Sequence, residues 1–113
     1  MNITAESYGH AVILNVNGEL TEDSLGAFRQ AVDHQLEAEG VIDLVLNLEQ
    51  TPFIDSVCLE HLTDLQERLN ERFGQIRLLK CDENVRKIME ITRLDGTFEL
   101  CDDVADAIKA IEP

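Results

Sequence analysis

Short apolar runs with a two-residue period alternate along this chain with longer runs whose apolar residues recur every three or four positions. In residues 42–48, apolar and more polar side chains alternate, which is typical of a strand with one strongly buried face and one mixed face. From about Ser56 the spacing becomes helical, and Gly74 supplies a stop signal. The apolar positions of this helix are Leu59, Leu62, Leu65, Leu69 and Phe73. The segment therefore predicts a strand, a short loop and a helix.

The rest of the chain repeats the same alternation. Further strands are predicted over residues 3–7, 11–16, 76–79 and 98–101, and the first of these forms either a hairpin with the next or a sheet edge. Further helices are predicted after caps at Thr21, at Asp82 and at Asp102 or Asp103. Their apolar faces are Leu25, Phe28, Val32 and Leu36 in the first, Val85, Ile88, Met89 and Thr92 in the second, and Val104, Ala107, Ile108 and Ile111 in the last. The predicted order is β-β-α-β-α-β-α-β-α.

This order predicts the α/β class: one domain over residues 1–113, with a mixed, mostly parallel sheet and about four helices packed mainly on one face. In such sheets, ligands and partners meet the loops beyond the carboxyl ends of the strands. Four predicted loops lie there, at residues 18–21, 52–56, 81–84 and 101–103. We refer to this edge of the sheet as the carboxyl rim.

The charge of the chain limits its partners. Nine Lys and Arg residues against 23 Asp and Glu residues give a formal net charge of −14, and no long basic run is present. Such a field repels nucleic-acid backbones and anionic membranes, so neither is expected as a partner. It is typical of a solvated surface that keeps the chain soluble, which is the favoured interpretation, or of a surface that binds a basic protein. The sequence shows no run of about 20 apolar residues that would insert into a membrane, and its first residues do not resemble a signal peptide. We therefore expect a cytoplasmic protein.

No strong catalytic or metal-binding motif is present, so we expect neither an enzyme nor a bound cofactor or metal. The cysteines are odd in number and widely spaced, which predicts buried reduced thiols. The histidines His10, His34 and His61 are each expected to have a solvent-exposed structural role. The best candidate for a catalytic pair is Cys58 with His61, because the two residues are one helical turn apart. They would be catalytic only if the Cys58 thiolate were accessible and activated.

The corner Asp55-Ser56 permits two interpretations. Either hydroxyl or carboxylate could cap the helix that follows, by accepting a hydrogen bond from a first-turn N–H group. Alternatively, Ser56 could accept a phosphate at the positive end of the helix dipole, although the acidic surroundings resist added negative charge. Capping is the favoured interpretation.

Several stretches in this order resemble the STAS domain family, named for sulphate transporters and anti-sigma factor antagonists. They are Gly18-Glu19-Leu20, the run 45–48 leading into Phe53-Ile54-Asp55-Ser56, and the segment 85–98, VRKIMEITRLDGTF. The resemblance covers nearly the whole chain, and in size the chain is similar to bacterial anti-sigma factor antagonists. It implies a module that binds a serine-kinase-like anti-sigma factor until one serine at the start of the second helix is phosphorylated.

This chain departs from the family pattern at the position of that switch. When the family's Asp-Ser-Ser-Gly motif is aligned with Asp55, Ser56, Val57 and Cys58, the phosphorylated serine falls on Val57 and the glycine on Cys58. The acidic residue that commonly follows Gly-Glu-Leu is Thr21 here. Because valine has no hydroxyl group, the resemblance implies a docking surface without the standard covalent switch.

The sequence leaves three hypotheses about function, of which the first is the regulatory module that the resemblance implies. The predicted contact surface of a non-catalytic, protein-binding regulatory module consists of Glu19, Thr21, Asp55, Ser56, Val57, Cys58 and exposed helix positions such as Glu60 and His61. The alternative is a STAS accessory subunit that binds a small ligand or acts beside a membrane transport system. The third is an enzyme that uses Cys58 with His61.

Overall fold

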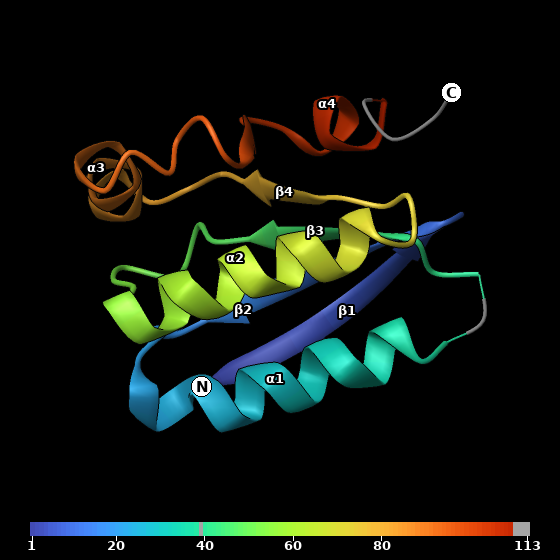
Figure 1. Cartoon of the computed structure of the whole chain (residues 1–113), viewed down its shortest axis with the longest axis horizontal. Coiled ribbons are helices and arrows are strands. Elements are labelled where there is room, and N and C mark those ends of the chain that lie inside the picture. The colour runs from blue at the N-terminus through green and yellow to red at the C-terminus, as the bar shows by residue number, and fades with distance from the viewer. Residues whose placement is uncertain (39, 110–113) are drawn as a thin grey trace.

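The computed structural model describes residues 1–38 and 40–109, which form one sheet and its covering helices (Figure 1). The predicted order of elements is confirmed. The strands are β1 (Asn2–Tyr8), β2 (Ala11–Asn17), β3 (Asp43–Asn47), β4 (Ile76–Leu79) and β5 (Glu99–Cys101). The helices are α1 (Glu22–Leu36), α2 (Ser56–Asn70), α3 (Glu83–Ile91) and α4 (Val104–Lys109).

The strands lie in the sheet in their order along the chain, β1-β2-β3-β4-β5. β1 pairs antiparallel with β2 through a hairpin and forms one edge of the sheet, while the pairs β2–β3, β3–β4 and β4–β5 are parallel. Right-handed crossovers between consecutive parallel strands place the connecting helices on the same face. Accordingly, α1, α2 and α3 share one face, and the predicted mixed, mostly parallel α/β sheet is confirmed.

The larger part of the core lies between that face and the three helices. Leu14, Leu46 and Leu78 from the central strands are buried against apolar side chains of α1, α2 and α3. The helical contributors are Phe28, Val32 and Leu36 from α1, Cys58, Leu59, Leu62, Leu65 and Leu69 from α2, and Val85 and Met89 from α3. Apart from Cys58, these are positions that the helical spacing predicts, so burial of apolar surface fixes which face each helix turns inward. Phe73, predicted as the last apolar position of the second helix, lies instead beyond the end of α2 with 95% of its surface exposed.

The opposite face of the sheet is covered by α4 on one side only. Ala107 of α4 is buried with Ile13, Val45, Leu79 and Cys101, and α4 contacts β4 and β5. Because side chains alternate between the faces of a strand, this second cluster explains why β3 is buried on both sides rather than on one strong face. The face over β1 and β2 is polar where α4 does not reach.

The predicted boundaries agree closely with the structure. The helix caps at Thr21 and Asp82 and the helix start at Ser56 are confirmed, and the last strand begins at Glu99 rather than Phe98. Of the two candidate caps of α4, Asp103 is the one whose carboxylate accepts a hydrogen bond, from the N–H of Asp106 at 2.8 Å. Ile111, predicted to lie in the core, is outside the described residues.

Candidate functional site

The carboxyl rim is built where the loop after β2 meets the loop after β3. Leu20 and Ile54 form an isolated parallel bridge, with the N–H of Leu20 bonded to the Phe53 carbonyl and the N–H of Asp55 bonded to the Leu20 carbonyl, both at 3.0 Å. Leu20 and Ile54 are fully buried beneath this bridge. Residues 18–21 and 52–56, which are distant in sequence, are therefore held side by side.

Asp55 ties two helices together at this point. Its Oδ1 accepts a hydrogen bond from the N–H of Cys58 at 2.9 Å, which makes it the N-cap of α2. Its Oδ2 accepts from the N–H of Glu22 at 2.8 Å, and Glu22 is the first residue of α1. The hydrogen bond from Cys58 is the main reason that the pKa of Asp55 is lowered, and the bond from Glu22 acts in the same direction. One carboxylate thus satisfies the N-termini of both helices.

Of the two candidate caps of α2, Ser56 is not the one that the structure uses, which corrects the interpretation of its hydroxyl group as a cap. It is the first residue inside the helix, it is exposed, and among the described residues its hydroxyl group has no hydrogen-bond partner. Asp55 takes the capping position one residue earlier. Ser56 is therefore an accessible hydroxyl beside a carboxylate that already occupies the helix N-terminus.

Two of the three residues that depart from the family pattern, Val57 and Cys58, have opposite environments. Val57 exposes 40% of its surface at the start of α2, whereas Cys58 exposes only 1% and packs in the core. Burial, followed by the interaction with Asp55, raises the pKa of the Cys58 thiol to about 12. Cys58 is therefore not part of the exposed surface, and its thiol stays protonated at neutral pH.

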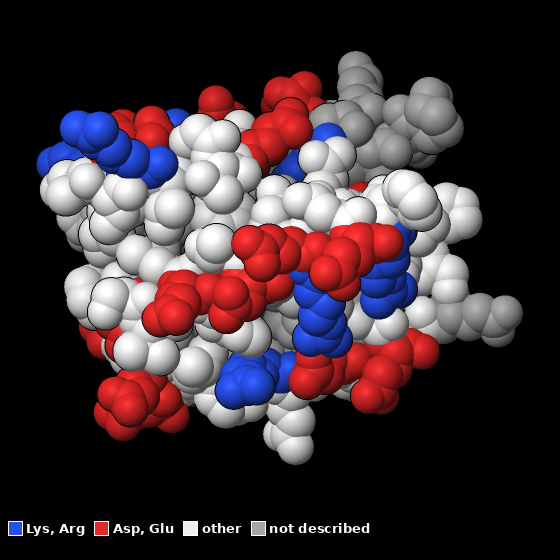
Figure 2. Space-filling view, viewed as in Figure 1, with Lys and Arg blue, Asp and Glu red and all other residues white. Residues whose placement is uncertain are grey.

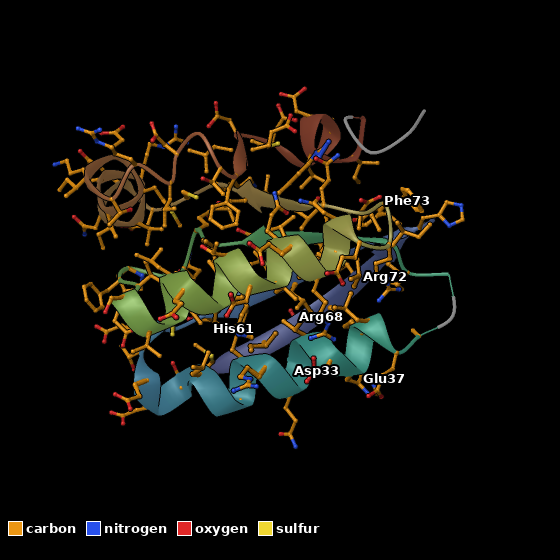
Figure 3. The ribbon with its side chains drawn as sticks, viewed as in Figure 1. Asp33, Glu37, His61, Arg68, Arg72 and Phe73 are labelled. Carbon is orange, nitrogen blue, oxygen red and sulfur yellow. The ribbon has the colours of Figure 1, made fainter. Side chains whose placement is uncertain are left out.

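His61 was predicted at an exposed position, but it is half-buried between α2 and α1 (Figure 3). Its ring meets the Phe28 ring edge to face, with 6.0 Å between the ring centres. Its Nε2 atom is buried and has no hydrogen-bond partner among the described residues. Burial, with a smaller contribution from Arg29, lowers the pKa of His61, so the ring is a neutral packing element and no bond joins it to Cys58.

The other predicted contact residues lie around this corner. Glu19 is exposed, and its carbonyl accepts a hydrogen bond from the Ser24 hydroxyl at 2.8 Å. The N–H of Thr21 donates to Ser24 Oγ at 3.0 Å, which fixes the turn into α1. Glu60 is exposed one turn along α2 from Ser56. The structure thus gathers all the predicted positions at one end of the α1–α2 pair, with Cys58 beneath the surface.

Two features of this surface were missed from the sequence. Phe53 exposes 43% of its surface next to the bridge, so the rim carries two exposed apolar side chains, Phe53 and Val57. In addition, four exposed carboxylates recur at helical spacing along α2 and its C-cap, and a band of acidic side chains runs along that helix in Figure 2. We call Glu60, Asp64, Glu67 and Glu71 the acidic stripe. Their spacings of four, three and four residues were a readable signal.

Basic side chains accompany the acidic stripe on the side that faces α1. Arg68 of α2 pairs with Asp33 of α1 at 3.2 Å, and both side chains are about half-exposed. Just after α2 ends, the Arg72 guanidinium donates a hydrogen bond at 2.6 Å to the carbonyl of Val41, in the loop after α1. The ion pair therefore links the last turns of α1 and α2, and the hydrogen bond links the segments that follow them.

The described part of the chain has neither a metal-binding cluster nor a membrane-spanning helix. Among residues 1–38 and 40–109, no group of three or more His, Cys, Asp or Glu side chains is arranged to hold a metal ion. Over the same residues, no helix combines the length and apolar character required to cross a membrane.

Comparison with known proteins places the chain among relatives of the same size. It is 21% identical to the anti-sigma F factor antagonist of Paenibacillus polymyxa, over 99% of this chain and 97% of that protein. It is 25% identical to a Thermotoga neapolitana protein whose name proposes the role of anti-sigma factor antagonist, over 89% of each chain.

Solved structures share the fold. An anti-sigma factor antagonist from Mycobacterium paratuberculosis is similar with a TM-score of 0.83 and 26% identity, covering 96% of this chain and 92% of that one. Unphosphorylated SpoIIAA, also an anti-sigma factor antagonist, is similar with a TM-score of 0.81 and 21% identity, covering 97% and 96%. The model of the STAS domain family matches residues 2–107. The chain therefore belongs to the STAS domain family.

Proposed function

We propose that this protein is a non-catalytic regulatory module that acts as an anti-sigma factor antagonist, binding a serine-kinase-like anti-sigma factor through the carboxyl rim and the start of α2. The proposed contact residues are Glu19, Thr21, Asp55, Ser56, Val57, Glu60 and the accessible part of His61, together with Phe53. Antagonist relatives that match along nearly their full length support this role. Cys58 is left out because it is buried.

The position of Val57 carries the proposal. In the resemblance to the family, this is where the phosphorylated serine stands, and here an exposed side chain without a hydroxyl group occupies it. A kinase that docks on this rim finds no acceptor at that position. Exposed Phe53 and Val57 instead offer apolar surface at the centre of a polar rim, which is the usual composition of a protein-binding patch. The complex is thus proposed to persist without the standard release step.

The acidic stripe supports a partner with basic surface. Glu60, at its rim end, lies close to the proposed contact, and the stripe continues along the same helix. Complementary charge accelerates encounter and orients two proteins, while the centre of the interface supplies most of the binding free energy. We therefore propose that the acidic stripe orients the partner during encounter and that the carboxyl rim contributes most of the binding free energy.

Calorimetric titration with the serine-kinase-like anti-sigma factors of the source organism tests the proposal. The wild-type chain is expected to bind one of them, and Val57→Asp is expected to weaken that binding at least about tenfold, because a charge enters a desolvated contact. Phe73→Asp is the matched control, since Phe73 is 95% exposed beyond the other end of α2. The proposal fails if none of these proteins binds, or if both substitutions weaken binding equally.

A further inference from the structure

A polar cavity lies on the other side of the sheet from α1, α2 and α3. It has a volume of about 210 Å³ and is lined by Asn2, Thr4, Asn15, Val16, Asn17, Asn47 and Gln50. These residues come from β1, β2, β3 and the loop after β3, where α4 does not cover the sheet. Of the seven, five carry carboxamide side chains and one carries a hydroxyl group.

Strand register gathers these side chains. Thr4 pairs with Asn15, and Asn15 pairs with Asn47, which gives a polar row across three neighbouring strands. Asn2 pairs with Asn17 two residues further along, so it adds a second row on the same face. Toward β5 the first row continues as Leu79 and Cys101, which are buried in the cluster that contains Ala107 of α4. The change from apolar to amide side chains thus coincides with the limit of α4.

The floor of the cavity is fixed by hydrogen bonds. Asn47 Nδ2 donates to Asn15 Oδ1 at 2.8 Å, and Asn47 Oδ1 accepts from the N–H of Glu49 at 3.1 Å. Asn15 Nδ2 reaches Thr4 Oγ1 at 3.4 Å. These bonds orient the two floor carboxamides before any ligand arrives, which is the arrangement that a binding site requires.

The walls keep their hydrogen-bonding capacity. The side chains of Asn2, Asn17 and Gln50 are exposed and make no hydrogen bonds to other described residues. Each carboxamide offers two donor hydrogens and an acceptor oxygen. The cavity therefore combines a preset floor with several groups that can donate to, and accept from, the same ligand.

The chemistry of the lining indicates the class of ligand. None of the seven lining residues is ionisable, although the chain has 23 acidic and nine basic residues, so recognition relies on hydrogen bonds rather than on charge. The net charge of −14 disfavours anions, and the lining has no aromatic ring on which a flat base could stack. The volume is below the usual range of sites for drug-sized ligands, which is about 300–1,000 Å³. We propose that this cavity binds a neutral, polyhydroxylated small molecule of monosaccharide size.

Nuclear magnetic resonance of the ¹⁵N-labelled full chain tests this proposal, with separate titrations of D-glucose, D-ribose and myo-inositol. At least one probe is expected to shift the side-chain amide signals of Asn15 and Asn47 with saturation. Asn17→Ala, at an exposed wall position, is expected to weaken that binding about tenfold, because it removes polar contacts without disturbing the floor. The matched control, Asn70→Ala at the exposed end of α2, is expected to leave it unchanged.

Three results would overturn the proposal: no saturable shift with any of the three probes, no effect of Asn17→Ala, or tighter binding of ribose 5-phosphate than of ribose. The last result would show that ligand binding in the cavity depends on charge rather than on hydrogen bonds to hydroxyl groups. The test is independent of the anti-sigma factor, because the titrations use this chain and the small-molecule probes alone.

Discussion

At the scale of single residues, Asp55 has a larger structural role than an ordinary helix cap, because its two oxygens serve two helices. Asp55→Asn is expected to lower the free energy of unfolding more than Asp82→Asn, since Asp82 accepts its bond at the N-terminus of α3 alone. Urea unfolding at neutral pH measures both variants. Equal losses would contradict the double role of Asp55.

The lowered pKa of Asp55 also sets a pH window. Its stabilising effect is fully present above the unfolded value of about 3.8, and it is lost as the pH falls from there through the lower folded value. In the Asp55→Asn variant, this part of the acid dependence is expected to disappear.

His61 predicts a second pH effect in a different window. Because burial lowers the pKa of His61 in the folded chain below its ordinary value of 6.5, the unfolded chain binds a proton more readily than the folded one. The contribution of His61 to the free energy of unfolding is therefore fully present above pH 6.5 and is lost as the pH falls from there through the lower folded pKa. Thermal unfolding between pH 7.5 and pH 5 is expected to show a shallower decline for His61→Leu than for wild type. His34→Leu, at an exposed position of α1, is the control, and a parallel decline in all three proteins would refute the assignment.

The thiol of Cys58 predicts slow chemical labelling. With a pKa raised to about 12 and 1% exposure, it has almost no thiolate at neutral pH. Iodoacetamide followed by peptide mass spectrometry is expected to modify Cys58 only after unfolding in urea. Rapid labelling of the folded protein would contradict this prediction and would support the hypothesis of an enzyme that uses Cys58 with His61.

At the scale of elements, two glycines predict opposite responses to the same substitution. A Cβ atom on Gly74, after α2, would collide with the carbonyl oxygen of Ile42, whereas one on Gly26, inside α1, has open space around it. Gly74→Ala is expected to cost about 1–3 kcal/mol of unfolding free energy, or more because the obstacle is backbone. Gly26→Ala is expected to add about 0.5–1 kcal/mol, because alanine favours the helix. Urea unfolding of both variants, with Gly96→Ala as a neutral reference, checks these signs.

The helices and strands could be predicted because the spacing of apolar residues and the positions of capping residues indicated the same boundaries along the chain. The helical spacing from Leu59 to Leu69 admits one burial pattern, and the structure has it. The alternation in residues 42–48 located the strand correctly, but the predicted mixed face is buried as well. The rim could be located because parallel strands place their following loops at one edge. Val57 and Cys58 were recognised from the resemblance to the STAS family, although their burial was not.

The remaining features depend on contacts between distant segments. The bond from Glu22 to Asp55 joins residues 33 positions apart, and the inward orientation of His61 depends on how α1 packs against α2. The amide cavity needs the register of β1, β2 and β3, which no local pattern specifies. A two-residue period of asparagines at Asn15 and Asn17 was the one local sign of it.

At the scale of the whole molecule, the net charge of −14 predicts how the proposed complex responds to salt. Association with a basic partner is expected to slow as ionic strength rises, because screening shortens the range of the attraction. Stopped-flow association rates measured between about 0.02 and 0.5 M salt should fall, with a smaller slope for the charge-neutralised Glu67→Gln, Glu71→Gln variant of the acidic stripe. A rate that does not depend on salt would exclude electrostatic orientation by this surface.

Docking without the covalent switch is tested by the intact mass of the chain after incubation with ATP and the kinase-like anti-sigma factor proposed as its partner. The wild-type chain is expected to gain no phosphate and to remain in the complex, whereas Val57→Ser is expected to gain about 80 Da, the mass of one phosphate group, and to be released. Phosphorylation of the wild-type chain, at Ser56 or elsewhere, accompanied by its release, would contradict the claim that this protein docks without the covalent switch.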